Sequence, residues 1–328
     1  MKILPIFLPQ KGCPFKCVYC NQNLITKAAE TDLQHIQFLI DQFCQFNYSE
    51  DKEIAFYGGT FTNLEEKLIK KLFQIAEPHI NANTGIRIST RPDFIFTGQL
   101  QKLKTRGLRT VELGIQSFSD KVLAASGRNY SKDTAQSACR IISSCNLALG
   151  IQLMPGLPGS DAASIKESIT SVLVLKPEFV RIYPTVVLKN TALERWFNSG
   201  KYLPLSLEKA VEITAEMIEI FQKNKIKVIK SGLHSDIEKQ NIIAGPYHES
   251  FGELVRMNLL FKKIIANYPK SKTFVISESD ISLFRGFKQK LIKRLKAEYQ
   301  METIPVIVDP NISKGNISFT DQTPQQRW

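Results

Sequence analysis

The 328-residue sequence lacks the features of a membrane protein or a disulfide-rich secreted protein. No stretch approaches the roughly 18 apolar residues that a membrane span needs. The apolar start is broken by Pro5 and Pro9 and has no small-residue cleavage site, which argues against a signal peptide. Six cysteines, three of them clustered, do not form a disulfide framework. We therefore expect a cytoplasmic protein without a membrane partner.

Composition is that of an ordinary globular protein with an excess of basic residues. Hydrophobic residues make up 43% and charged residues 23%, enough for one large domain or a large and a small one. The net charge of +12 favours a polyanionic partner such as RNA. A solvated basic surface is the alternative, and composition alone leaves both open.

The most informative feature is a group of three cysteines, Cys13, Cys17 and Cys20, with the spacing C-x3-C-x2-C. Three thiolates on one loop can hold three irons of a [4Fe–4S] cube, which normally takes four cysteine ligands. The fourth iron would then be open to a small molecule, as in reactive metal sites. A structural zinc or a four-cysteine cluster would need a fourth ligand, and neither His35 nor Cys44 has the spacing of a second half-site.

Strand-like apolar runs alternate with helix-like segments over the first two thirds of the chain. The predicted strands are Ile3–Leu8, Glu53–Tyr57, Ile86–Ser89, Thr110–Ile115, Leu147–Leu153 and Phe179–Pro184, and the predicted helices are Leu33–Phe46, Leu64–His79, Ser131–Ser144 and Ser160–Leu175. Asn63 and Glu66 have the spacing of a capping pair for the second helix. Six such units predict an α/β fold, a partial (β/α)6 TIM-type barrel with its chemistry at the C-terminal ends of the strands.

The pattern changes after residue 185. A long amphipathic helix is predicted over Leu207–Gln222, and Lys225–Lys230 is a candidate for a further strand. The strand-like runs Thr273–Ser277, Ile304–Val308 and Asn316–Phe319, with helices between them, predict a small C-terminal α+β extension. We expect a barrel domain over residues 1–230 and an extension over residues 231–328 that covers the substrate. The polar end, Thr320–Trp328, is expected to be disordered.

The cysteine loop, with Tyr19 just before its third cysteine, resembles that of the radical S-adenosylmethionine (SAM) superfamily. Phe56–Thr62 resembles its glycine motif, and Glu112–Ser117 and Gly150–Gly159 resemble its later SAM-contacting strand ends. More narrowly, three segments resemble the radical SAM half of the elongator catalytic subunit and, less closely, the oxygen-independent coproporphyrinogen oxidases: Thr90–Asp93, Gln116–Ser117 and Arg181–Pro184. The similarity covers about residues 1–230, and no acetyltransferase domain follows it.

This resemblance implies a [4Fe–4S] cluster on Cys13, Cys17 and Cys20, and SAM as the second cofactor. It implies that Gly58, Gly59 and Thr60 hold the SAM amino group, and that Gln116, Arg128 and Gln152 make further SAM contacts. For Arg128, whose partner would be the methionyl carboxylate, a surface charge is the alternative. Ser89 stands where relatives often carry a glutamate, and Met154 lies near the adenine or fills the core. No catalytic side chain is assigned; the candidates for substrate contact or hydrogen-atom relay are Tyr57, Arg91, Arg181, Tyr183 and Lys189.

The function implied is that of a radical SAM enzyme. An electron from a donor such as ferredoxin or flavodoxin cleaves SAM, and the resulting radical abstracts hydrogen from an unidentified substrate. The charge and the elongator resemblance favour RNA, as in tRNA modification. A small molecule such as a tetrapyrrole is the alternative, although Gln22 replaces the last cysteine of the C-x3-C-x2-C-x-C motif of coproporphyrinogen oxidases. A non-catalytic, cluster-bearing RNA-binding module is the third hypothesis.

Overall fold

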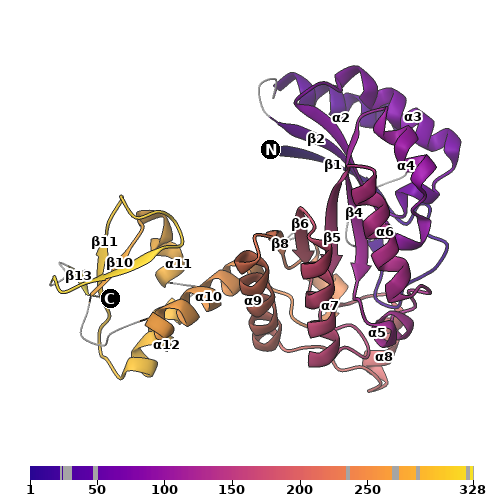
Figure 1. The fold of residues 1–328 in the computed structure, drawn as a ribbon. Coiled ribbons are helices and arrows are strands. Elements are labelled where there is room, and N and C mark those ends of the chain that lie inside the picture. Colours follow the sequence, from indigo (N-terminus) through magenta and orange to yellow (C-terminus); the bar gives the residue numbers. More distant parts are fainter. Residues whose placement is uncertain are drawn as a thin grey trace. The chain divides into compact units, whose positions relative to one another are not determined.

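A curled, all-parallel sheet of seven strands forms a half barrel in the computed structural model of this chain (Figure 1). The structure describes residues 1–22, 24, 32–46, 51–233, 237–267, 273–285, 289–322 and 326–327. In spatial order the strands are β1 (Lys2–Leu8), β2 (Lys52–Gly58), β3 (Thr84–Thr90), β4 (Leu108–Gln116), β5 (Ala148–Leu153), β6 (Phe179–Ile182) and β8 (Lys227–Ser231). The predicted α/β barrel-type fold is confirmed, and β8 is the further strand expected near residue 230.

Helices connect the strands along the chain: α2 (Leu33–Phe46), α3 (Glu66–Ala76), α4 (Thr97–Lys104), α5 (Asp120–Ala125), α6 (Lys132–Ser144), α7 (Ala162–Leu175), α8 (Ala192–Asn198) and α9 (Leu207–Lys223). Of these, α2, α3, α4, α6 and α7 lie along one face of the sheet (Figure 1). Apolar periodicity explains the longer ones. In α2, Ile36, Ile40 and Cys44 are four residues apart, share one face and are all buried. The short antiparallel pair β7 (Val187–Leu188) and β9 (Ile242–Ala244) lies apart from the sheet ladder.

The two faces of the sheet differ in chemistry because successive side chains on a strand point to opposite sides. One alternate set is apolar and almost fully buried; it includes Ile54, Phe56, Ile86, Ile88, Val111, Leu113, Ile151 and Val180. The other set is largely polar and includes Glu53, Tyr57, Arg87, Ser89, Glu112, Gln116, Gln152 and Arg181. The apolar set forms the core under the helices. The polar set lines the inside of the half barrel.

One predicted helix cap is wrong. α3 begins at Glu66 after Glu65, and no side chain caps its first turn. The Nδ2 group of Asn63 instead donates to the backbone oxygen of Gly12, at 2.8 Å. This long-range bond ties Asn63 to the cysteine loop and removes it from the helix start.

A second, smaller compact unit comprises residues 211–219 of α9 and residues 250–328, whereas residues 1–210 and 220–249 make up the first unit. Its sheet has the order β12 (Ile317–Thr320), β10 (Thr273–Ile276), β11 (Pro305–Val308) and β13 (Gln326–Arg327). Its further helices are α10 (Phe251–Asn267), α11 (Ile281–Arg285) and α12 (Lys290–Tyr299).

The predicted α+β character of the C-terminal extension is confirmed, while the domain boundary at residue 230 stays a prediction. The expectation of a disordered end is wrong for Gln326 and Arg327, whose backbone pairs with β11, while residues 323–325 and 328 lie outside the described residues. None of the helices within the described residues is both long and apolar enough to cross a membrane.

A substitution at Gly150 tests how tightly the inner face is packed. A Cβ added there would collide with the Phe179 ring, which stacks 4.6 Å from the guanidinium of Arg87. We expect Gly150→Ala to lower the free energy of unfolding by about 2 kcal/mol, the usual cost of overpacking, measured by urea denaturation. The control Gly98→Ala, on exposed α4 with nothing within 4 Å, should stabilise by up to about 1 kcal/mol. Equal stability of Gly150→Ala and the parent would contradict this packing.

Candidate active site

The loop that carries the three cysteines follows β1 and is fixed by the turn after β2. The Gly59 N–H donates to the Leu8 oxygen at 3.1 Å, and the Thr60 N–H donates to the Lys11 oxygen at 2.8 Å. A Cβ on Gly59 would collide with the Lys11 backbone, so this position requires a glycine. Thr60 Oγ1 also lies 3.3 Å from the Cys13 sulfur. The glycine motif therefore has a first role that needs no cofactor, which is to hold the cysteine loop.

A cavity of about 620 Å³ opens on the inner face of the half barrel, and all three cysteines line it. Of the other predicted SAM contacts, Gly58, Gly59, Gln116, Arg128 and Gln152 line it too. Thr60 is buried behind this lining, against Cys13. The further candidates at the cavity wall are Tyr57, Ser89, Arg91, Met154, Arg181 and Tyr183. Lys189 is not among the lining residues; its backbone oxygen accepts a bond from Asn21.

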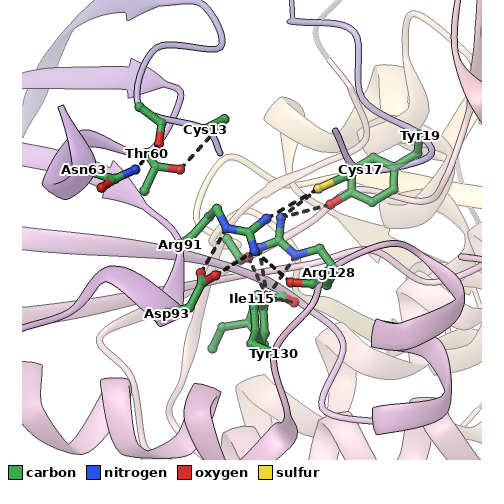
Figure 2. A network of polar contacts seen from close by, with 12 residues as sticks. Cys13, Cys17, Tyr19, Thr60, Asn63, Arg91, Asp93, Ile115, Arg128 and Tyr130 are labelled. Atoms are coloured by element: carbon green, nitrogen blue, oxygen red, sulfur yellow. Dashed lines mark hydrogen bonds and ion pairs between the residues drawn. The ribbon is translucent and has the colours of Figure 1, made fainter. Parts of the chain in front are cut away.

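Two arginines approach the Cys17 sulfur, Arg128 Nη1 at 3.3 Å and Arg91 Nη1 at 3.7 Å (Figure 2). Asp93 holds Arg91 through two bonds of 2.8 and 2.9 Å. Arg128 is only 4% exposed, so the alternative that it is a surface charge is wrong. We call Cys17, Arg91, Asp93, Arg128 and Tyr130 the Arg128 network.

Every hydrogen-bonding nitrogen of Arg128 is engaged within the protein. Its Nε and Nη2 donate to the Tyr130 hydroxyl at 3.0 and 2.8 Å, and Nη2 also donates to the Gly114 oxygen. Its Nη1 reaches the Tyr19 hydroxyl at 3.4 Å as well as Cys17. A carboxylate could be held by Arg128 only in exchange for some of these bonds.

The end of β4 has an unusual backbone. Gln116 adopts a φ of 73°, and the pairing register shifts between Gly114 and Gln116. Such a conformation is uncommon outside glycine and often marks a functional position. Gln152 Nε2 donates to Gln116 Oε1 at 3.0 Å. Among the described residues no partner is seen for Gln116 Nε2 or Gln152 Oε1, which leaves both amides with hydrogen-bonding capacity at the cavity wall.

A second polar group on the cavity wall, the Arg181 cluster, consists of Tyr57, Glu112, Arg181 and Tyr183. Arg181 Nε lies 2.9 Å from Glu112 Oε1, and its two terminal nitrogens donate to the hydroxyls of Tyr183 and Tyr57 at 3.1 and 3.0 Å. Burial raises the pKa of the Glu112 carboxyl, against the opposing effect of Arg181 and Arg87. Burial also raises the pKa of Tyr57 to about 12, with Glu112 adding to the shift.

Behind this cluster lies a fully buried ion pair that was not predicted. Arg87 Nε donates to Glu53 Oε2 at 2.7 Å, and Arg87 Nη1 lies 3.6 Å from Glu112 Oε2. The sequence signal was present, because Glu53, Arg87 and Glu112 are charged residues inside otherwise apolar strands. A charge is almost never fully buried unless it is paired.

Two family models match this chain. The model of the radical SAM superfamily matches residues 7–172, and that of the radical SAM C-terminal domain matches residues 177–260. The chain belongs to the radical SAM superfamily. As a member of that superfamily it is an enzyme.

Three curated relatives of this radical SAM chain show what it is similar to. The tRNA uridine(34) acetyltransferase of Methanocaldococcus infernus is 26% identical over 297 residues, covering 77% of this chain and 55% of that protein. Elongator complex protein 3 of Homo sapiens is 26% identical over 204 residues, covering 55% and 37%. Heme chaperone HemW of Bacillus subtilis is 28% identical over 245 residues, covering 71% and 62%. The chain thus spans between about a third and two thirds of the length of these relatives.

Two solved structures share the fold. Elp3 of Methanocaldococcus infernus, with residues 1–46 deleted, aligns with a TM-score of 0.61 and 22% identity over 80% of this chain and 62% of that chain. Coproporphyrinogen III oxidase (HemN) from Escherichia coli aligns with a TM-score of 0.52 and 20% identity over 68% and 52%. At these identities the likeness extends to the fold alone.

Three thiols that line one cavity are a donor set compatible with an iron–sulfur cube. Within the part of the chain that the structure describes, no three His, Cys, Asp or Glu side chains converge on one metal-ion position. A cube places its three protein thiolates on three different irons, so its ligands need not converge. Burial, with Cys17 and Cys13 nearby, raises the pKa of the Cys20 thiol to about 12. Because metal ligation requires the thiolate, loading at neutral pH would release this proton.

The buried pair Glu53–Arg87 gives a stability prediction. Glu53→Gln leaves the Arg87 guanidinium, 1% exposed, without its main counter-charge, and Glu53 does not line the cavity. We expect the free energy of unfolding to fall by about 3 kcal/mol, measured by urea denaturation. The control Glu66→Gln, in the exposed Glu66–Lys70 pair, should change nothing measurable. An equal loss of unfolding free energy in the two variants would contradict the claim that burial makes the Glu53–Arg87 pair important for stability.

Proposed function

We propose that this chain binds a [4Fe–4S] cluster through Cys13, Cys17 and Cys20, binds SAM in the adjoining cavity, and acts on an RNA substrate. One observation supports the binding of the cluster and of SAM. Three cysteines line the wall of one cavity of about 620 Å³, and two arginines are directed at Cys17. When bound, these groups would supply reductive cleavage of SAM and a radical able to abstract hydrogen. The electron would come from an external donor such as ferredoxin or flavodoxin.

The chain's own residues would prepare the site in three ways. The turn at Gly58–Thr60 holds the cysteine loop, as its backbone bonds to Leu8 and Lys11 indicate. Arg91 and Arg128 offset the negative charge that thiolate ligands bring. Gln116 and Gln152 offer amide groups to the amino or hydroxyl groups of SAM.

RNA is the proposed substrate class for two reasons. Relatives that share 26% identity with this chain are a tRNA uridine(34) acetyltransferase and Elongator complex protein 3. The net charge of +12 suits a polyanion. A small-molecule substrate remains the second candidate, favoured by the 28% identity with HemW. Against it, Gln22 stands where coproporphyrinogen oxidases carry the last cysteine of their motif, and its side-chain amide donates to the Gly58 oxygen.

Anaerobic reconstitution with iron and sulfide tests the cofactor assignment. We expect about four irons per chain, and 5′-deoxyadenosine after addition of SAM and dithionite. Cys17→Ala should lose most of the iron and all of the product. The matched control Cys139→Ala removes a buried thiol outside the cavity and should keep both. Iron retained in Cys17→Ala, or a loaded parent that forms no 5′-deoxyadenosine, would contradict the proposal.

Salt dependence tests the substrate class. We expect a labelled tRNA transcript to bind the full chain in fluorescence anisotropy and to weaken steeply between 50 and 200 mM salt, because phosphate contacts release counterions. Hemin, titrated by absorbance, is the comparison for the small-molecule candidate. Saturable hemin binding without tRNA binding would refute the RNA assignment. Tight tRNA binding by a loaded protein that does not cleave SAM would instead indicate a non-catalytic RNA-binding module.

A further inference from the structure

The Arg181 cluster has a hydrogen-bonding capacity that its contacts within the described protein do not use. Its members come from β2, β4 and the end of β6, and all four line the cavity. Arg181 is fixed on three sides, by Glu112 at 2.9 Å, Tyr183 at 3.1 Å and Tyr57 at 3.0 Å. A guanidinium held in this way fixes the two phenol oxygens in turn.

Both tyrosines accept from Arg181, so each still has its own O–H to donate. Among the described residues no acceptor is seen for the hydroxyl hydrogen of Tyr57 or of Tyr183. Burial keeps both phenols protonated by raising the pKa of each, that of Tyr57 to about 12. A phenol that accepts from a cation is also a stronger donor, because hydrogen bonds in a chain polarise one another. The cavity wall therefore presents two strong O–H donors.

The charged groups around these donors are already paired with one another. Glu53 and Glu112 face Arg87 and Arg181 in a buried set of two negative and two positive groups. A carboxylate ligand at the two tyrosines would meet an Arg181 that is already paired with Glu112, and an unpaired buried charge is costly. A neutral oxygen acceptor adds no charge and satisfies the donors, which otherwise cost about 1–3 kcal/mol each when buried unpaired.

We propose that Tyr57 and Tyr183, positioned by Arg181, bind a neutral carbonyl group of the substrate. This inference rests on the proposed function only in taking the cavity as the place where a substrate is held. A nucleobase carbonyl and an acyl carbonyl share the required chemistry. Arg181 is a positioning residue here, and the two tyrosines determine specificity.

The test uses the full chain without a cluster, labelled with 3-fluorotyrosine and followed by ¹⁹F NMR. Resonances are assigned with Tyr57→Phe and Tyr183→Phe. The probes are uridine for a base carbonyl, N-methylacetamide for an acyl carbonyl, and acetate for a carboxylate. We expect at least one neutral probe to shift both assigned resonances saturably, and acetate to bind at least tenfold more weakly. The neutral probe that binds identifies the source of the carbonyl.

Affinities of the variants complete the test. Each Phe substitution removes one hydrogen bond and should raise the Kd of the neutral probe about tenfold. The control Tyr202→Phe removes a buried hydroxyl that donates to the Gly156 oxygen and does not line the cavity, so the Kd should stay unchanged. If a Phe variant does not fold, the parent's own resonances still give the answer once the other tyrosines are assigned.

Three results would overturn the inference: no shift of either resonance with any neutral probe, tighter binding of acetate, or a loss of SAM affinity in the Phe variants without a change for the neutral probe. The last result would assign the tyrosines to the cofactor. Only the SAM affinity is measured on the reconstituted chain; the carbonyl and acetate titrations need no cluster, and none of the measurements needs turnover. Failure of SAM cleavage with carbonyl binding intact would therefore refute the proposed function and leave this inference standing.

Discussion

The site depends on a close backbone contact between the cysteine loop and the turn after β2. Two N–H groups, of Gly59 and Thr60, bind the oxygens of Leu8 and Lys11, and only a residue without a Cβ allows this approach at Gly59. Because β1 and β2 are neighbouring parallel strands, the register of the sheet decides where the loop lies. The backbone contacts of the fold thus place the three thiols at the cavity wall.

The inner face of the half barrel adds a second constraint, because it carries charges where most sheets carry apolar side chains. Glu53, Arg87, Glu112 and Arg181 are acceptable there only as pairs, since each lone charge would cost several kcal/mol. Two polar groups share that wall: the Arg128 network beside the cysteines, which bonds the backbone oxygen of Gly114 on β4, and the Arg181 cluster, which contains Glu112 two residues earlier on the same strand.

Local patterns predicted the sheet, the longer helices and the grouping of the three cysteines, because apolar periodicity and cysteine spacing are contained within short stretches of sequence. They missed α4 and α5, which are 8 and 6 residues long and too short for a clear period. They misassigned Asn63, whose true partner Gly12 lies 51 residues away. A charge inside a strand, such as Arg87, signals a buried partner, but only the fold shows that Glu53, 34 residues earlier, is that partner.

The central claim is that three thiolates leave one iron of a cube open to SAM. Electron paramagnetic resonance of the anaerobically reconstituted and reduced chain, recorded with and without SAM, tests it most directly. The account predicts the signal of a reduced [4Fe–4S] cluster whose g values change when SAM is added, because SAM would bind the open iron. A spectrum that SAM leaves unchanged, or a protein that binds one zinc in place of the cluster, would contradict it.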